Sequence, residues 1–219
     1  MSQIRQVFIY RWQHAISWGI SSKLGQAFTL EARLKGIKVQ RKTVFYGRPI
    51  LIIHPGSRVE IGERCSIVSS SRRCSTANLY APFRIQTSAS SAEITIGASC
   101  GFNGTSIWCR SSRIEIGNRV MIGPNVTIMD SPGHPISPVS RRMKYPEKYL
   151  DEPVTIGDDV WIGNGAIVLA GSSIGKNSVV GAGSVVTGPI PANAVAVGAP
   201  ARVVRLFDPN SGPSESSKD

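Results

Sequence analysis

The chain has 219 residues and a formal net charge of +11, with 41% hydrophobic and 18% charged residues. These values fit one compact domain with a short appendage and exclude a disordered chain or a coiled coil. The sequence holds no apolar run long enough to cross a bilayer, so it predicts no transmembrane helix, and we expect an intracellular, cytoplasmic protein. The 22 glycines and 14 prolines indicate a chain that turns often and is mostly β.

Residues 1–48 carry most of the positive charge. They hold nine Lys and Arg residues against one acidic residue, Glu31, which gives a net charge of +8, whereas residues 49–219 have a net charge of +3. We therefore expect no nucleic-acid-binding surface on the main body.

The same N-terminal segment is predicted to be partly helical. Residues 4–20 have one broad apolar face, formed by Ile4, Val7, Phe8, Trp12, Ala15 and Ile16. This helix either packs on the open end of the main body, where it covers strand edges, or docks on an anionic membrane surface. The sequence leaves both interpretations open.

From residue 49 onward, apolar residues recur at every sixth position. A short first copy contains Ile61 and Ile67. Three longer runs follow: Ile96, Phe102, Trp108 and Ile114; then Ile116, Ile122 and Ile128; then Ile156, Ile162, Val168, Ile174, Val180 and Val186. A period of six does not fit an α-helix, because it turns successive apolar residues by about 240° around the helix axis. Three hexads instead make one coil of a triangular prism, with the apolar residue of each hexad pointing inward, and we expect about five or six coils.

The repeat, together with several longer strings, resembles the hexapeptide-repeat acyltransferases. The strings are IGPNVTI (122–128), GHP (133–135), VTIGDDVWIG (154–163), VGAGSVVT (180–187) and VGAPARVVR (197–205). They look like the galactoside and maltose O-acetyltransferase group and its relatives in polysaccharide biosynthesis. The resemblance implies an all-β fold, the left-handed parallel β-helix, over residues 49–206, with residues 207–219 as a disordered polar tail.

One excursion interrupts the expected coils. The spacing from Ile128 to Ile156 is not a multiple of six, and the loop 130–153 contains no hexad. Long loops in a regular solenoid are usually functional or disordered. The resemblance implies that His134 in the GHP string is the general base that takes the proton of a sugar hydroxyl. Its carboxylate partner is Glu147 or Asp130, or both acids merely offset nearby basic residues.

Further site residues are implied by the resemblance. Asn103 matches an asparagine of the acceptor pocket and would stabilise an oxyanion, although it could also cap a corner of a coil. The Asn164 backbone amide matches a contact to the thioester region of acetyl-CoA, and Trp161 matches an aromatic wall near the thiol. Ala182 and Thr187 match contacts to pantetheine and adenine.

Arg202 and Arg205 match the phosphate contacts of the family. Gly188 stands where relatives often have a lysine, so phosphate binding would depend more on these two arginines. Ser111 stands where galactoside-type relatives have an aspartate, which predicts a different sugar pocket. The neighbouring Arg110 and Arg113 either favour an acidic acceptor or form a solvated charge pair.

The sequence does not predict a metal site. Cys65, Cys74, Cys100 and Cys109 form no CxxC pair and have no histidine at ligand spacing, so we expect free, buried thiols. A β-helix hydratase resembling γ-carbonic anhydrase needs three histidine ligands, and this chain has only His14, His54 and His134.

The function that these features predict is acetyl transfer from acetyl-CoA to a hydroxyl of a saccharide, such as a cell-surface polysaccharide precursor, without a metal. N-acylation of an amino sugar and a non-catalytic assembly module remain as alternatives. The resemblance also implies a homotrimer with active sites between subunits. Peripheral membrane contact through residues 1–48 is the remaining expectation.

Overall fold

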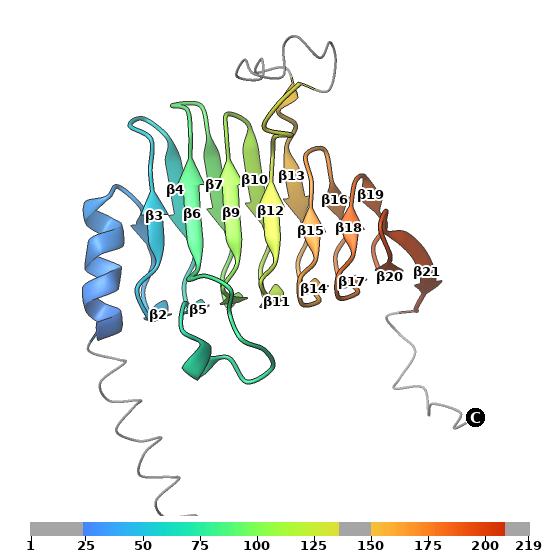
Figure 1. Ribbon diagram of the computed structural model, residues 1–219, viewed down its shortest axis with the longest axis horizontal. Coiled ribbons are helices and arrows are strands. Elements are labelled where there is room, and N and C mark those ends of the chain that lie inside the picture. The colour runs from blue at the N-terminus through green and yellow to red at the C-terminus, as the bar shows by residue number, and fades with distance from the viewer. Residues whose placement is uncertain (1–23, 136–149, 209–219) are drawn as a thin grey trace, which may run out of the picture.

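The protein is a triangular prism of stacked parallel strands with a helix at its N-terminal end (Figure 1). The computed structural model describes residues 24–135 and 150–208. Residues 24–34 form the helix, and the strands that follow build three sheets, one on each face of the prism. The predicted fold class, a left-handed parallel β-helix of hexapeptide repeats, is confirmed.

Each sheet takes one strand from every coil. The first sheet, called sheet A here, contains seven strands: β1 (Lys38–Val39), β4 (Arg58–Ile61), β7 (Glu93–Ile96), β10 (Arg113–Ile116), β13 (Val154–Ile156), β16 (Ser173–Ile174) and β19 (Pro189–Ile190). Sheet B contains eight: β2 (Val44–Tyr46), β5 (Ser66–Val68), β8 (Gly101–Asn103), β11 (Met121–Pro124), β14 (Trp161–Ile162), β17 (Val179–Val180), β20 (Ala194–Val197) and β21 (Arg202–Leu206). Sheet C contains six: β3 (Ile50–Ile52), β6 (Arg84–Thr87), β9 (Ser106–Cys109), β12 (Thr127–Met129), β15 (Ile167–Val168) and β18 (Val185–Val186).

The apolar residues of the hexads form the core. Ile156 pairs with Ile174, and Ile162 pairs with Val180, so equivalent residues stack directly from coil to coil. These side chains are at most 3% exposed. One predicted core position is wrong: Ile107 is buried in β9, whereas Trp108 points outward and is partly exposed. Alternation of side chains along a strand allows only one of two neighbours to face inward.

The corners of the coils need small residues because successive turns stack closely there. A Cβ atom on Gly157 would lie 2.7 Å from the amide nitrogen of Lys176 in the next coil. Close by, Asp159 adopts a left-handed backbone with φ of 60°, a conformation in which Asn, Asp and Gly are enriched. The fifth position of the hexad is small for a similar reason: the Ser178 hydroxyl lies inside and donates to the carbonyl of Pro191 at 2.8 Å.

The coils begin earlier than the sequence indicated. β1 pairs with β4 and β2 pairs with β5, so the β-helix starts at Lys38, whereas the sequence analysis placed its start at residue 49. The described helix, 24–34, lies against this first coil, with Ala32 fully buried and Phe28 partly buried against the core. The helix predicted at residues 4–20 lies outside the described residues. The described part of the chain contains no helix with the length and apolarity needed to span a bilayer.

Two excursions interrupt the prism, and the sequence analysis predicted only one. Ile162 pairs with Val180, three hexads further along the chain, but Ile122 pairs with Ile162 at more than twice that spacing, because the loop 130–153 intervenes. The spacing from Ile67 to its partner Phe102 is nearly as long. Most of that extra length is a segment at residues 69–83, which contains the 3-10 helix η1 (Ser71–Arg73).

Residues 69–83, the corner insertion, dock on the side of the prism where sheets B and C meet. The side chain of Asn125, in a later coil, accepts a hydrogen bond from the Tyr80 amide at 2.9 Å and donates one to the Asn78 carbonyl at 3.0 Å. Gly104 permits the close approach, because a Cβ atom there would lie 2.9 Å from the Ala81 carbonyl oxygen. The insertion is therefore fixed in place and forms a raised wall beside sheet B.

Candidate active site

A groove of about 550 Å³ lies between the corner insertion and the outer face of sheet B. Its floor is one row of outward residues on successive strands, in which Gly101 pairs with Met121, Met121 with Trp161, and Trp161 with Val179. Met121 and Trp161 are 60% and 51% exposed, whereas Gly101 leaves open space at the end of the row. The groove therefore has a wide, apolar floor that a ligand could cover.

Four of the predicted site residues line this groove. They are Asn103, Trp161, Asn164 and Ala182. They belong to the coils of β8, β14 and β17, so they are spread along the prism axis near the edge between sheets B and C. At roughly 4.8 Å per coil, this edge runs about 20 Å from Asn103 to the hairpin before β21. An extended chain such as the pantetheine arm fits along such an edge.

The Asn103 side chain is held in a defined orientation. Its Nδ2 donates to the Ile122 carbonyl at 3.2 Å, and its backbone carbonyl accepts from the Asn125 amide at 3.0 Å. A primary amide nitrogen has two N–H groups, so the second remains for a ligand. Asn103 thus has a structural contact and also a donor that can serve at the groove.

Gly123 of the preceding coil stacks on the backbone amide of Asn164 and has no side chain that would cover it. A Cβ atom on Gly123 would lie 2.8 Å from this nitrogen. Gly163 has the same relation to the Ala182 amide, at 2.5 Å. Gly157, on another edge of the prism, stacks just as closely on the next coil. The fold itself therefore requires the close stacking. On the groove side it also leaves amide groups that can donate to a carbonyl oxygen.

His134 lies away from this groove in the same protomer. The segment after β12 leaves at the edge between sheets C and A, at the top of Figure 1, whereas the sheet B strands β11, β14 and β17 lie at the bottom. The whole width of sheet C separates the two regions. His134 is exposed, and a Cβ atom on its neighbour Gly133 would lie 3.6 Å from the Trp108 ring. That ring is fixed by a 3.0 Å hydrogen bond from its Nε1 to the Ser88 hydroxyl.

The base of the His134 loop is anchored by a buried carboxylate, Asp130. Its side chain accepts hydrogen bonds from the amides of Arg110 at 2.6 Å and Ser112 at 2.8 Å. The Cys109 thiol donates to the same carboxylate at 3.3 Å. Burial, with the adjacent Asp130 charge, raises the pKa of Cys109. Because Asp130 is engaged by the turn between β9 and β10, the geometry does not favour it as the partner of His134.

A second carboxylate anchors the returning end of the loop. The side chain of Asp151 is buried and forms an ion pair with Arg110 at 2.7 Å, and it also accepts from the Ser111 hydroxyl. The Arg110 charge is thereby matched within the protein, and Arg113 pairs with Glu115 at 3.3 Å. Neither arginine supports the predicted recognition of an acidic acceptor. Glu147, the other predicted partner of His134, lies outside the described residues.

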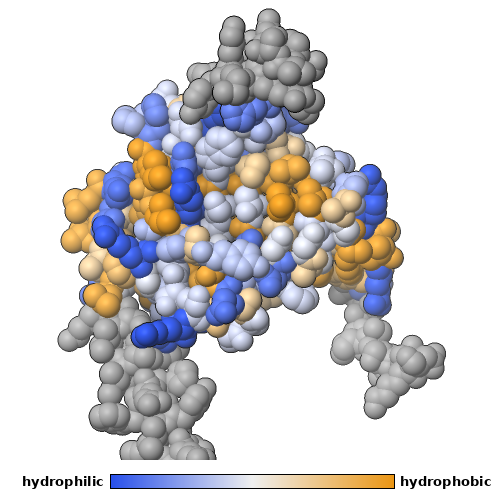
Figure 2. Space-filling view, in the orientation of Figure 1, coloured by the Kyte–Doolittle hydropathy of each residue, from blue (hydrophilic) through white to orange (hydrophobic). Residues whose placement is uncertain are grey.

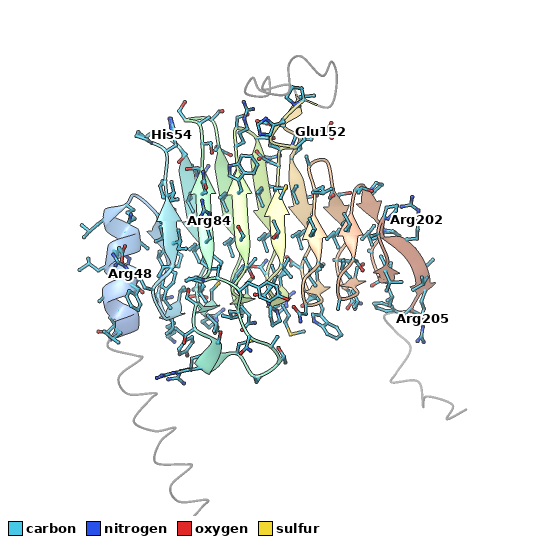
Figure 3. All side chains as sticks on the ribbon, in the orientation of Figure 1. Arg48, His54, Arg84, Glu152, Arg202 and Arg205 are labelled. Atoms are coloured by element: carbon cyan, nitrogen blue, oxygen red, sulfur yellow. The ribbon has the colours of Figure 1, made fainter. Side chains whose placement is uncertain are left out.

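The remaining predicted residues lie beyond the groove. Thr187 follows β18 on the side of sheet C away from the groove and does not line it. Arg202 and Arg205 are exposed on β21, which folds back antiparallel on β20, and Figure 3 shows both at the C-terminal end of the prism. Arg202 pairs with Val197 at the end of the edge that Asn164 and Ala182 follow, where it could meet phosphates, whereas Arg205 pairs with Val195 further back along β20.

Some residues of the groove are not predicted by the sequence analysis. Arg73 and Cys74 of the corner insertion form its wall, and Met121 forms part of its floor. The sequence does carry a signal for the insertion, because the spacing from Ile67 to Ile96 is again not a multiple of six. Among the described residues, no group of three His, Cys, Asp or Glu side chains could hold a metal ion.

Comparison with known proteins agrees with this architecture. Residues 153–188 match the family described as bacterial transferase hexapeptide (six repeats). A galactoside O-acetyltransferase of Lactococcus lactis is 42% identical over 149 residues, which cover 68% of this chain and 63% of the relative. One from Escherichia coli is 49% identical over 92 residues, which cover 42% of this chain and 43% of the relative.

A solved structure extends the likeness along the chain. A hexapeptide-repeat-containing acetyltransferase of Vibrio cholerae has a TM-score of 0.55 and 23% identity, and the match covers 93% of both chains. Residues 153–188 thus carry the hexapeptide repeat of the bacterial transferases, and the chain shares the fold of the solved acetyltransferase. Its sequence is similar to the galactoside O-acetyltransferases, although the chain spans less than two thirds of the length of these two relatives.

Proposed function

We propose that the protein is an O-acetyltransferase that moves an acetyl group from acetyl-CoA to a hydroxyl of a saccharide. The observation that carries the proposal is the groove, which gathers Asn103, Trp161, Asn164 and Ala182 along one edge. The sequence similarity to galactoside O-acetyltransferases supports the same chemistry. An acceptor that is a precursor of a cell-surface polysaccharide remains part of the proposal.

The described residues can supply each part of the chemistry. His134 is exposed and takes the proton as the acceptor oxygen attacks the thioester carbonyl. The free N–H of Asn103 or the Asn164 amide stabilises the negative charge on the carbonyl oxygen. The carbon–sulfur bond then breaks, and the proton passes from His134 to the leaving sulfur. The route uses no metal and no covalent enzyme intermediate.

The separation of His134 from the groove makes a second subunit part of the proposal. One protomer places the two on opposite sides of sheet C, so His134 of one copy must act at the groove of a neighbour. In a closed ring of three copies, every groove receives one such loop. We therefore propose a homotrimer with three composite sites.

Mixing two inactive variants tests the composite site. His134→Ala and Asn103→Ala are refolded together in equal amounts. If the two residues come from different subunits, about one quarter of all sites in the random mixture regain both residues, and thiol release returns to about that fraction of the wild-type rate. Each variant refolded alone is the control. No recovery in the mixture would contradict the shared site.

Free-thiol release from acetyl-CoA tests the acceptor class. Free oligosaccharides, nucleotide sugars and lipid-linked sugars are compared, each with and without an amino group in place of the hydroxyl. Turnover confined to hydroxyl acceptors supports the proposal, and turnover confined to amino sugars replaces it with N-acylation. Absence of turnover with every acceptor, despite binding of acetyl-CoA, would indicate a non-catalytic assembly module.

A further inference from the structure

The N-terminal helix leaves apolar side chains exposed. Leu24, Leu30 and Leu34 are 51%, 57% and 80% exposed. We call Leu30 and Leu34 the leucine row. A helix turns by about 100° per residue, so these two side chains lie about 40° apart around the helix axis. They lie roughly opposite Gly25 and Ala32, which are buried. In Figure 2 apolar side chains gather at this end of the molecule, with hydrophilic ones beside them. Neighbouring exposed leucines are unusual on a surface that only meets water.

A basic cleft adjoins the leucine row. It has a volume of about 320 Å³ and lies between the helix and the first corner of the β-helix, with Leu30, Arg33, Arg41 and Lys42 in its lining. Thr29 and Thr43 also line the cleft, but their hydroxyls donate to the Gly25 and Gly62 carbonyls. The cations of the cleft suit a phosphate group.

The charges of the cleft are only partly matched within the protein. Arg41 pairs with Glu63 at 3.5 Å, whereas Arg33 donates to the Val39 carbonyl at 2.9 Å, which leaves its charge unmatched by that bond. Neither Arg33 nor Lys42 has an ion pair with an acidic residue of the described chain. Residues 24–48 together carry six Lys and Arg against Glu31, a net charge of +5. Arg33 and Lys42 therefore place positive charge beside Leu30 of the leucine row.

We propose that this end of the prism is a docking surface for an anionic membrane, in which the basic cleft binds a lipid phosphate and the leucine row enters the headgroup region. An apolar row bordered by cations is the arrangement that interfacial binding needs. Each basic side chain near an anionic bilayer adds to the affinity within a Debye length. The surface is independent of the groove, so it can act whatever the acceptor of the enzyme is.

Flotation of the full chain with vesicles tests this surface. Neutral phosphatidylcholine vesicles are compared with vesicles that also contain phosphatidylglycerol, at low and high salt. We expect binding only to the anionic vesicles, and release by salt. Leu30→Gln/Leu34→Gln and Arg33→Gln/Lys42→Gln should each lower the partition coefficient by about 10-fold or more. The charge-matched control is Arg113→Gln/Lys176→Gln, which removes two cations far from the helix and should stay within about twofold of the wild type.

Two further measurements separate the alternatives. Thermal unfolding and thiol release must match the wild type, so that loss of flotation is not loss of folding. Inorganic phosphate is added as a competitor. If phosphate binds but the wild type does not float with the anionic vesicles, the cleft serves free phosphate alone, which would overturn the proposal. The proposal also fails if the leucine variant keeps its flotation but changes its mass in sedimentation, because the leucine row would then be a contact between copies.

Discussion

The coils from Val154 to Val186 and those from Arg58 to Met129 are built on one plan but differ in regularity. In the C-terminal coils, equivalent residues pair three hexads apart, as Ile156 does with Ile174. In the earlier coils, the spacing from Ile94 to its partner Ile114 exceeds three hexads by two positions, and two long excursions leave the corners. Regular coils supply stability and a straight edge, whereas the irregular ones supply the His134 loop and the wall of the groove. His134 and the groove wall thus come from segments where the repeat fails, whereas Trp161, Asn164 and Ala182 lie on the regular coils.

The largest expected effect comes from the excursion that carries His134. His134→Ala should lower kcat by about 10²-fold or more, the scale of a lost general base, because the imidazole would no longer take the proton of the acceptor hydroxyl. The affinity for acetyl-CoA should change little, since the groove lies across sheet C. Steady-state thiol release and equilibrium binding measure the two quantities. Wild-type turnover in this variant would remove His134 from the mechanism.

A core substitution in the regular coils should affect stability rather than chemistry. Ile162 is fully buried, and Ile162→Ala should lower the free energy of unfolding by about 3 kcal/mol through lost burial and a cavity. Leu79→Ala, in the partly exposed corner insertion, is the control and should cost less than about 1 kcal/mol. Denaturant unfolding compares them, and equal losses would show that the insertion is as much a part of the core as the coils are.

Asp130 should connect the His134 loop to the coils, because it fixes the base of the loop to the turn between β9 and β10. Asp130→Asn keeps the volume but replaces an acceptor oxygen that faces backbone amides with an amide group, so the base of the loop should shift. We expect kcat to fall by about 10-fold with little change in acetyl-CoA affinity. Asp130→Glu, which retains the charge, should recover part of the rate. A loss of stability with an unchanged kcat would assign Asp130 to folding alone.

Arg202 tests the far end of the groove edge. Arg202→Ala should weaken acetyl-CoA binding by about 10-fold, the scale of one charge-assisted hydrogen bond, and leave the rate at saturation almost unchanged. Arg205→Ala should behave alike, and Arg113→Ala, on sheet A, serves as a control of equal charge. Equilibrium binding of acetyl-CoA compares the three variants. Unchanged binding in both β21 variants would place the phosphates elsewhere.

The smallest expected effect is a change in labelling at Cys74, on the groove wall. Burial opposes ionisation of this thiol, but hydrogen bonds from the Thr76 and Ala77 amides lower its pKa, so its thiolate fraction at neutral pH is increased. Cys65, Cys100 and Cys109 are buried, and one fast-reacting thiol per chain is expected. Acetyl-CoA should slow its alkylation a few-fold, measured by mass spectrometry, with Cys74→Ser as the blank. Equal rates with and without acetyl-CoA would place the donor away from the corner insertion.

Much of the fold could be predicted because a period of six leaves few alternatives. Ile156, Ile162 and Val168 mark three faces of one coil, and their spacing alone fixes which side chains point inward. The prediction for Trp108 is wrong because its coil is longer than three hexads, which shifts the phase, and the sequence offers Ile107 and Trp108 as equally apolar candidates. The start at Lys38 is not evident in the sequence because β1 and β2 are short and are flanked by charged residues.

The candidate site could be predicted only in part. Asn103, Trp161, Asn164 and Ala182 lie on the coils themselves, so a resemblance along the chain also fixes their positions in space. The corner insertion and the Asp130 anchor depend on contacts between segments with no common period, such as Asn125 with Tyr80. No local pattern encodes those contacts. His134 is a third case, because its position in one chain does not show which groove it serves.

The constant rise per coil also makes the prism a molecular ruler. Each coil between Asn103 and β21 lengthens the groove edge by a fixed step of roughly 4.8 Å, and neither end needs to change when a step is added or removed. The number of coils, rather than the shape of any loop, therefore sets the span between Asn103 and the arginines of β21. Chains of this architecture can change that span only in whole steps.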